Sequence, residues 1–414
     1  MKKGFVVLSH QGLTMVGAIA EQLRSRDLAV FVVSSRSARG LTADWLEKVD
    51  KAHFVDSLSL THQDVVDFLQ TIDSEVQVMG CISVWDGYRE LMAQANERLG
   101  ASDVPAEVVR LLRDKLAFRH ALHARGLSRK RAQQLDAQSF ASLQSPSTLF
   151  IKPRTGLASF GAFRADKVTC YQELEEIWAL ARTDLAYDGV FAPQAEFIAE
   201  DFIAGQEFSF EVSVRRGLAS VHAVHEKVDL TAFHRTILEN ACLCPPRSLE
   251  DRWLTRGIDL VKRVLQGVGV TEGVYHVEAR HDSQQGWEII EANPRIGGAY
   301  IVDSTRLHRG VDLIGRWIDL IAGRDPAVAS SESRSTFFRV FFGEPGMTIE
   351  RLVRADIGHP VVIDKLFVKE GERLPFADRE IFIGQALWDI TALDVDLDTF
   401  IDSTKNYFSV EYKT

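Results

Sequence analysis

The stretch GVYHVEARHDSQQGWEIIEANPRIGG, residues 273–298, predicts a β-hairpin that carries acidic side chains. Two runs rich in strand-forming residues, GVYHVEAR and WEIIEA, flank the turn-forming run HDSQQG. Side chains alternate between the two faces of a strand, so Glu291 and Asn293 share a face. An even-length turn pairs Glu278 with Ile289 and places Glu278 diagonal to Glu291 on that same face. The hairpin therefore collects two carboxylates and an amide oxygen on one face.

These three side chains offer only oxygen ligands, which suit Mg²⁺ held jointly with substrate phosphates. Arg295 follows two residues after Asn293, and its guanidinium suits phosphate or acyl-phosphate oxygens. The alternative is a solvent-facing hairpin with ordinary acids. The apolar residues interleaved with Glu278, Glu291 and Asn293 weaken that alternative. The hairpin therefore predicts a magnesium site beside a phosphate site.

Length and composition exclude several classes of protein for this chain. The chain has 414 residues, 46% of them hydrophobic, and is long enough for several domains or subdomains. Its net charge of −10 argues against a general nucleic-acid binder. Its apolar runs are too short to cross a bilayer or to form a signal peptide, so we expect no membrane association. Four scattered cysteines without a metal-site spacing fit a reduced, cytoplasmic setting.

The first 112 residues predict an open α/β sheet. FVVLS (5–9), a helix-like segment over 14–25 and AVFVVSS (29–35) form a βαβ opening. The full G-x-G-x-x-G fingerprint is missing after the first strand, which argues against a dinucleotide site there. Further along the chain, the region 229–250 predicts a loop, and residues from about 335 predict short strands with turns.

A second candidate site lies in IKPRTGLASFGAF, residues 151–163. A predicted strand ends near Lys152, and Gly156, Ser159 and Gly161 follow in a short loop. Glycines let backbone N–H groups approach phosphate oxygens, serine adds a donor, and lysine adds a point charge. Taken alone, such a loop is more often an ordinary turn, and it lacks the G-K-[ST] ending of a Walker A loop.

A third candidate site is EDFIAGQEFSFE, in which Glu200 and Glu207 bracket a turn next to the apolar Phe202 and Ile203. Such a segment presents backbone groups to a purine edge, while Glu207 accepts hydrogen bonds from ribose hydroxyls. Taken alone, an exposed hairpin is the favoured interpretation.

Other polar residues carry a weaker signal. Trp85 and Asp86 end a predicted parallel strand, where α/β sheets often place sites, yet an ordinary turn is favoured. His234, Arg235 and Glu239 fall in the predicted loop, and nothing in their spacing requires contact with a substrate.

The order of the candidate sites resembles that of the ATP-grasp family. A lysine at a helix start, a Lys-Pro-Gly-Ser loop, E-x-F-I-x-G-x-E and E…E-x-N-P-R follow one another over about residues 1–325. The resemblance implies an α/β, multidomain ATP-grasp fold. We expect an N-terminal Rossmann-like domain at 1–113, a small lid subdomain at 114–203, a large subdomain with the Mg-ATP site at 204–325, and a β-rich C-terminal subdomain at 326–414.

The resemblance also implies roles in nucleotide binding. Lys115 matches a lysine that contacts the nucleotide phosphates, and Lys152 one that contacts adenine or phosphate. Residues 156–161 match the lid loop over the β- and γ-phosphates. The implied adenine hinge and ribose-binding acid are Glu200, Phe202, Ile203 and Glu207.

At the other end of the motif series, Glu278, Glu291 and Asn293 match the Mg²⁺ ligands of the family. Arg295 matches the arginine that stabilises the transferring phosphate and the acyl phosphate. His276 stands where some relatives carry a catalytic arginine. This departure makes Arg295 the preferred catalytic cation and leaves the role of His276 open.

Within the family, the pattern is most similar to amino-acid ligases that make dipeptides. The features are His276-x-Glu278, E-A-N-P-R-I-G-G at 291–298, GVDLIG at 310–315 and a β-rich C-terminal region. The resemblance implies an ATP- and Mg²⁺-dependent ligase, with Mn²⁺ as a substitute, that joins two amino acids or analogues through an acyl phosphate and releases ADP and phosphate. It implies small-molecule carboxylate and amine partners and leaves a homodimer open. The alternatives are a ligase for another carboxylate or amine, and a catalytically silent ATP-binding regulator.

Overall fold

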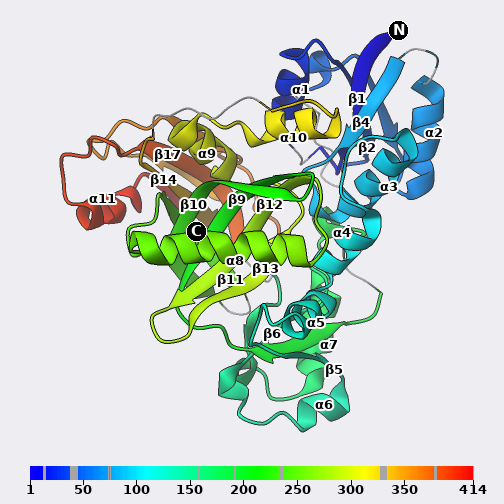
Figure 1. The fold of residues 1–414 in the computed structure, drawn as a ribbon. Coiled ribbons are helices and arrows are strands. Elements are labelled where there is room, and N and C mark those ends of the chain that lie inside the picture. Colours follow the sequence, from blue (N-terminus) through cyan, green and yellow to red (C-terminus); the bar gives the residue numbers. More distant parts are fainter. Residues whose placement is uncertain are drawn as a thin grey trace.

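The computed structural model describes residues 1–12, 15–37, 45–72, 74, 76–156, 159–190, 193–233, 236–326, 333–376 and 380–413. The N-terminal part is an open parallel sheet in the order β3-β2-β1-β4. Its strands are β1 (Lys2–Ser9), β2 (Ala29–Ser35), β3 (Lys51–Val55) and β4 (Val76–Ile82). The helices α1 (Val16–Arg24), α2 (His62–Ile72) and α3 (Arg89–Leu99) pack beside it (Figure 1). The predicted α/β opening is therefore present.

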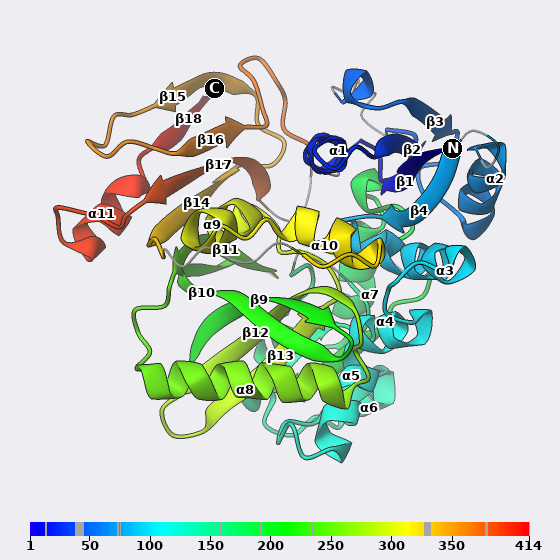
Figure 2. The same cartoon turned by 45° about the horizontal axis from the view of Figure 1, so that its top comes forward.

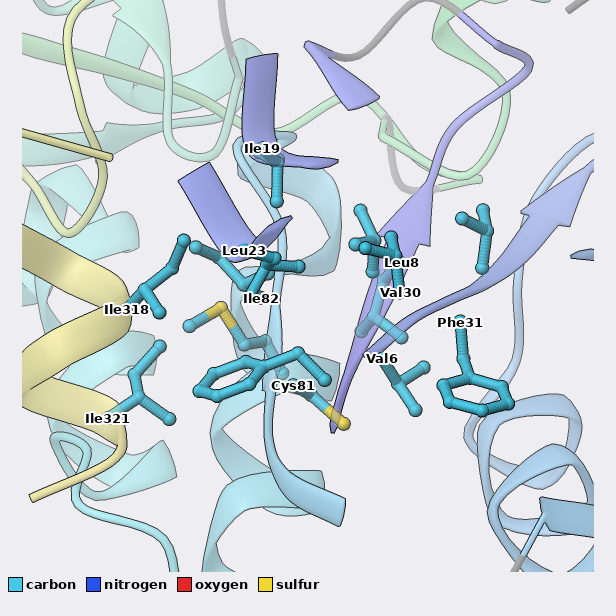
Figure 3. Packing of buried hydrophobic residues seen from close by; sticks show 14 of the residues in the cluster. Val6, Leu8, Ile19, Leu23, Val30, Phe31, Cys81, Ile82, Ile318 and Ile321 are labelled. Atoms are coloured by element: carbon cyan, nitrogen blue, oxygen red, sulfur yellow. The ribbon is translucent and has the colours of Figure 1, made fainter. Parts of the chain in front are cut away.

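A helix from far along the chain completes the core of this sheet. Helix α10 (Leu313–Ile321) packs Ile318 and Ile321 against residues of β4 and α1 (Figure 3). The approach is so close that a Cβ added at Gly80 would lie 2.3 Å from Cγ2 of Ile321. Arg26 and Asp319 form an ion pair across the same contact, with Nε 2.9 Å from Oδ1. The N-terminal sheet is thus joined to later parts of the chain by a buried apolar contact.

A short helical connection leads to a second, smaller sheet. Asp114 ends α4 (Ala106–Arg113) and caps α5 (Lys115–Ala124), where its carboxylate accepts a hydrogen bond from the N–H of Ala117. The smaller sheet is antiparallel, in the order β5-β8-β6-β7. Its strands are β5 (Ala132–Leu135), β6 (Leu149–Pro153), β7 (Phe163–Arg164) and β8 (Phe197–Asp201). Helices α6 (Ala137–Ala141) and α7 (Tyr171–Ala181) accompany it.

The largest sheet has eight strands in the order β13-β12-β9-β10-β11-β14-β17-β16. Its strands are β9 (Gln206–Arg215), β10 (Leu218–Phe233), β11 (Thr236–Cys244), β12 (Gly273–Asp282), β13 (Gly286–Asn293), β14 (Thr336–Gly343), β16 (Ile363–Leu366) and β17 (Ile381–Asp389). Helix α8 (Asp251–Gly267) lies across β9, β12 and β13 and covers one face (Figure 1). Because side chains alternate along each strand, the acids between those apolar residues point to the other face.

The predicted loop over 229–250 is wrong for most of its length. Residues up to Phe233 continue β10, and β11 begins at Thr236, with pairs such as Thr231–Leu238 between them. Pro245 and Pro246 follow β11, and β11 itself pairs with β10 on one side and with β14 on the other. His234 and Arg235 lie outside the described residues.

The C-terminal strands continue the large sheet across the predicted boundary at 325/326. Strand β14 pairs with β11, and β17 pairs with β14 (Figure 2). Helices α9 (Ile301–Arg309) and α11 (Leu397–Thr404) and the strand pair β15 (Ile349–Arg354) and β18 (Phe408–Tyr412) complete this part. Among the described helices, none is both long and apolar enough to cross a membrane.

Candidate active site

A cleft lies between the small antiparallel sheet and the β13-β12-β9 end of the large sheet. It encloses about 910 Å³, part of which is open to solvent. The candidate residues that line it are Lys115, Lys152, Gly156, Ser159, Glu200, Phe202, Ile203, Glu207, Glu278, Glu291, Asn293 and Arg295. The fold therefore brings most of the predicted site residues to one cleft.

The hairpin of β12 and β13 carries the predicted metal ligands, but its register differs from the prediction. Glu278 pairs with Glu291, and Ala279 pairs with Ile289, so Ile290 is an extra residue in β13. The predicted pairing of Glu278 with Ile289 is wrong because of this bulge. As a result the two carboxylates stand directly opposite each other rather than diagonally.

Asn293 completes this set of oxygen ligands. Its Nδ2 donates to Oε1 of Glu291 over 2.9 Å, which leaves its Oδ1 for a cation. Two carboxylates and one amide oxygen on one face are a donor set that fits Mg²⁺. Glu278, Glu291 and Asn293 are therefore the residues of this cleft that would hold the metal.

Glu278 forms an ion pair with a buried lysine that lies outside the predicted motifs. Nζ of Lys227 lies 2.5 Å from Oε1 of Glu278, 2.7 Å from Oε1 of Glu207 and 2.7 Å from Oε1 of Glu239. Burial alone would lower the pKa of Lys227, but the three carboxylates raise it well above its ordinary value. Lys227 is therefore a fixed positive charge inside the cleft wall.

His276, two residues before Glu278 on β12, is the second cation that contacts Glu278. Nδ1 of His276 is 2.8 Å from Oε1 of Glu211, and Nε2 is 3.4 Å from Oε1 of Glu278. Burial alone would lower the pKa of His276, but the two carboxylates raise it to about 10. The pKa of Glu211 is held at about 2, because the charge of His276 and its hydrogen bond outweigh the effect of burial. His276 lies outside the cleft lining and contacts it through Glu278.

Glu291 faces a different cation. Nζ of Lys115 is 3.4 Å from Oε2 of Glu291 and 3.5 Å from the carbonyl oxygen of Gly156. Lys115 begins α5, whereas Glu291 belongs to the large sheet. The ion pair therefore bridges the two sides of the cleft.

Three consecutive residues at this junction reach three different parts of the molecule. Nε of Arg113 is 3.2 Å from Oδ2 of Asp86, at the edge of the N-terminal sheet. Asp114 accepts from Nη2 of Arg154, at the end of β6, over 2.6 Å. Lys115 forms an ion pair with Glu291 of the large sheet. The connection between α4 and α5 thus ties the parts around the cleft together.

The opposite end of the cleft is built mainly from the small sheet. Lys152 of β6 and Glu200 of β8 form a buried ion pair, and Nε of Arg119 lies 3.4 Å from Oε2 of Glu200. Burial lowers the pKa of Lys152, against the opposing effect of Glu200. Burial works against ionisation of Glu200 as well, but the charges of Lys152 and Arg119 hold its pKa below its ordinary value.

The predicted hinge supplies an aromatic wall to this end of the cleft. The ring of Phe202 lies 6.3 Å from that of Phe150, and the guanidinium of Arg164 stands 3.9 Å from its centroid. Nη1 of Arg280 donates to the carbonyl oxygen of Ile203 over 2.7 Å. The hinge backbone is therefore fixed at the cleft edge by a residue of β12.

The predicted phosphate loop borders the same cleft. Gly156 and Ser159 line it, and Gly161 has a φ of +64°, a conformation that favours glycine. The hydroxyl of Thr236 donates to the carbonyl oxygen of Ser159 over 3.1 Å. Residues 157–158 lie outside the described residues.

Several residues of the site were missed from the sequence. Lys227 lies outside the predicted motifs, and Glu239 falls in the predicted loop, although β11 carries it into the cleft. Glu211 was not considered at all. The alternation of polar and apolar residues along β9 is the signal that could have found Glu211.

Comparison with known proteins agrees with this geometry. Residues 145–303 match the family model described as "ATP-grasp domain". Residues 145–303 of the chain are therefore similar to an ATP-grasp domain. The predicted family and the predicted α/β fold class are therefore confirmed.

The relatives include enzymes that act on amino acids. The chain is 24% identical over 251 residues to alanine–anticapsin ligase of Bacillus amyloliquefaciens, a match that covers 56% of this chain and 51% of that one. Its fold is similar to that of L-amino acid ligase from Bacillus licheniformis, with a TM-score of 0.81, 17% identity and coverage of 100% and 99% of the two chains.

A more distant neighbour in structure has nucleotide bound. It is the biotin carboxylase domain of Hydrogenobacter thermophilus 2-oxoglutarate carboxylase in complex with MgADP and bicarbonate, with a TM-score of 0.73, 13% identity and coverage of 100% and 91%. The curated relatives are matched over only 27% to 51% of their own lengths. The chain is thus similar in fold to an L-amino acid ligase, and part of its sequence is similar to alanine–anticapsin ligase.

Proposed function

We propose that this ATP-grasp protein is an ATP-dependent carboxylate–amine ligase that joins two amino acids or close analogues by an amide bond. The observation that carries the proposal is the hairpin itself. Glu278 and Glu291 stand opposite each other, Asn293 follows on the same face, and Arg295 lines the same cleft. An intact metal and phosphate site of this kind is a poor fit to a catalytically silent regulator.

The first step transfers the γ-phosphoryl group of ATP to a substrate carboxylate. A carboxylate oxygen attacks the phosphorus, the bond to the bridging oxygen breaks, and ADP leaves. Mg²⁺ held by Glu278, Glu291 and Asn293 would neutralise charge on the phosphate oxygens. Arg295 stabilises the charge that develops on the transferring group, and Phe202 and Ile203 hold the purine.

In the second step the substrate amine attacks the acyl carbon of the acyl phosphate, and inorganic phosphate leaves. The chain's own groups do little covalent chemistry here. They position the two reactants and exclude water, which would otherwise hydrolyse the acyl phosphate. Gly156 and Ser159, which line the cleft, would cover the phosphates, with Lys115 beside Gly156.

We propose amino acids as substrates because the similar proteins include alanine–anticapsin ligase and an L-amino acid ligase, which are named for ligation of amino acids. A panel of amino acids, singly and in pairs, tests the proposal by phosphate release and by the mass of the coupled product. We expect ADP and phosphate with a dipeptide-like product. AMP and pyrophosphate would overturn the mechanism, whereas ADP release with another carboxylate or amine would change only the substrate class.

A further inference from the structure

The segment that follows β4 contacts two consecutive residues beside the predicted metal ligands, Pro294 and Arg295. Nε of Arg89 donates to the carbonyl oxygen of Pro294 over 2.8 Å. Asp86, three residues before Arg89, faces the side chain of Arg295, with Oδ1 3.7 Å from Nε. One short segment after β4 therefore contacts both the backbone and the side chain of the turn that follows the metal ligands.

The Arg89 contact is rigid. Its side chain is only 1% exposed, and Nη1 and Nη2 lie 3.0 Å and 2.5 Å from the two oxygens of Asp103. Nδ2 of Asn96 donates to the same carboxylate over 2.8 Å. A bidentate, buried arginine–carboxylate pair fixes geometry more strictly than a single hydrogen bond. The position of the Pro294–Arg295 turn relative to Asp86 is therefore well defined.

Asp86 divides its two oxygens between two arginines. Oδ2 accepts from Nε of Arg113 over 3.2 Å, whereas Oδ1 is buried and makes no hydrogen bond within the described residues. A buried carboxylate oxygen without a hydrogen bond is costly unless a charged partner faces it. Arg295 is that partner. Burial alone would raise the pKa of Asp86, but Arg113, Arg295 and Lys115 hold it below its ordinary value, so the carboxylate is charged.

Two contacts orient the guanidinium of Arg295, one at Nε and one at Nη1. Nε faces Asp86, and Nη1 donates to the carbonyl oxygen of Ile296 over 2.9 Å. These contacts leave Nη2 for a phosphoryl oxygen in the cleft. Lys115 pairs with Glu291 and also acts on Asp86 through its charge, and it would repel an arginine that had no negative charge nearby.

We propose that Asp86 is a positioning residue, which uses its buried carboxylate to aim Arg295 at the group being transferred. The inference rests on the proposed function, because it gives Asp86 a role in the phosphoryl-transfer step. It also gives the N-terminal sheet a part in the chemistry, since Asp86 follows the carboxyl end of β4.

The test compares Asp86→Asn with two controls in one assay. Hydroxylamine traps the acyl phosphate as a hydroxamate when an amino acid is supplied with ATP and Mg²⁺. We expect Asp86→Asn to lower kcat at least about tenfold while KM for ATP stays within about twofold, because the lost charge serves the transferring group and not the nucleotide. Unchanged kcat, or a change confined to KM, would overturn the inference.

The controls separate positioning from a structural role. Asp319→Asn breaks another ion pair between the N-terminal part and α10 and should keep activity within about twofold. Arg113→Gln removes the other partner of Asp86 and should keep kcat within about threefold, because Asp86 still faces Arg295. If the Asp86→Asn protein does not fold, the kcat of the Arg113→Gln enzyme tests the inference instead. A loss of more than about tenfold in a folded Arg113→Gln enzyme would show that Asp86 acts by tethering α4 and would reject the inference.

The same assay separates this inference from the proposed function. A wild-type enzyme that forms no hydroxamate with any amino acid removes the proposed function and the role of Asp86 together. A wild-type enzyme that forms hydroxamate, beside an Asp86→Asn enzyme of equal kcat, removes only the role of Asp86.

Discussion

The two ends of the cleft are held by charges of different origin. At the nucleotide end, formed by Phe150, Lys152, Glu200, Phe202 and Ile203, the central ion pair joins two strands of one small sheet. At the reacting end, formed by Glu278, Glu291, Asn293 and Arg295, every charged side chain takes a partner from another element: Lys227 from β10, Lys115 from α5 and Asp86 from the segment after β4.

Under the proposed function, the two ends of the cleft serve different steps, nucleotide binding and phosphoryl transfer. A pair within one sheet keeps its geometry when the parts of the molecule shift relative to one another. Pairs between separate parts change with any such shift, so the reacting end depends on how the N-terminal sheet, α5 and the large sheet are assembled. Nucleotide binding and phosphoryl transfer should therefore be separable by mutation.

The largest effect is expected from Glu291→Gln. The substitution keeps the size of the side chain but removes one anionic ligand and the partner of Lys115. Mg²⁺-dependent phosphate release should fall by about 100-fold or more, with an unchanged melting temperature. Glu272→Gln, just before the same hairpin, is the matched control, because its carboxylate binds the backbone N–H of Arg216. Near-normal turnover of a folded Glu291→Gln enzyme at ordinary Mg²⁺ would remove Glu291 from the metal site.

Arg295→Ala tests the same end from the phosphate side. We expect the hydroxamate signal to fall by about tenfold or more, because the cation acts on the transferring group. ATP affinity, measured by calorimetry, should change less than about threefold. Loss of ATP binding in parallel with loss of hydroxamate would place Arg295 at the nucleotide and would erase the distinction between the two ends.

Phe202→Ala is the corresponding test at the nucleotide end. It removes an aromatic wall of the cleft and the ring that stands against Arg164. KM for ATP should rise by about tenfold, since aromatic and cation–π contacts contribute about 1–2 kcal/mol. The kcat should stay within about threefold. An unchanged KM with a lowered kcat would contradict the hinge assignment.

The sequence predicted the two ends of the cleft unequally. Glu278, Glu291, Asn293 and Arg295 lie within one hairpin, so alternation and motif spacing were enough to group them. The bulge at Ile290 was not predictable, because nothing in WEIIEA says which isoleucine leaves the ladder.

Local sequence patterns could not predict the ion-pair partners of these residues. Lys227 is 51 residues from Glu278, and Asp86 follows a strand of a different sheet. Long-range pairing of this kind depends on strand order, which a single sequence specifies only weakly. The N-terminal α/β unit was predicted well for the opposite reason, because each buried strand is a continuous apolar run.

The smallest effect is expected from His222, which lies outside both ends of the cleft. Its substitution tests the influence of pH on the stability of the fold separately from the influence of pH on the cleft. His222 lies on β10, the strand that carries Lys227, and its Nε2 is 2.7 Å from Oγ of Ser213. Burial, followed by the charges of Arg316 and Arg309, lowers the pKa of His222 to about 4. Because its ordinary pKa is 6.5, the unfolded chain binds a proton between pH 6.5 and about pH 4 that the folded chain does not bind.

The unfolding free energy should therefore rise with pH across this window, and acidification from pH 6.5 to about 4 should lower it. His222→Gln keeps a polar side chain but cannot titrate, so its stability should depend less on pH, by about 1–2 kcal/mol over the window. Urea unfolding at a series of pH values measures the difference, with activity near neutral pH as the check that the cleft is intact. Equal pH dependence in the two proteins would show that His222 is not held neutral, and acid effects on activity would then need another source.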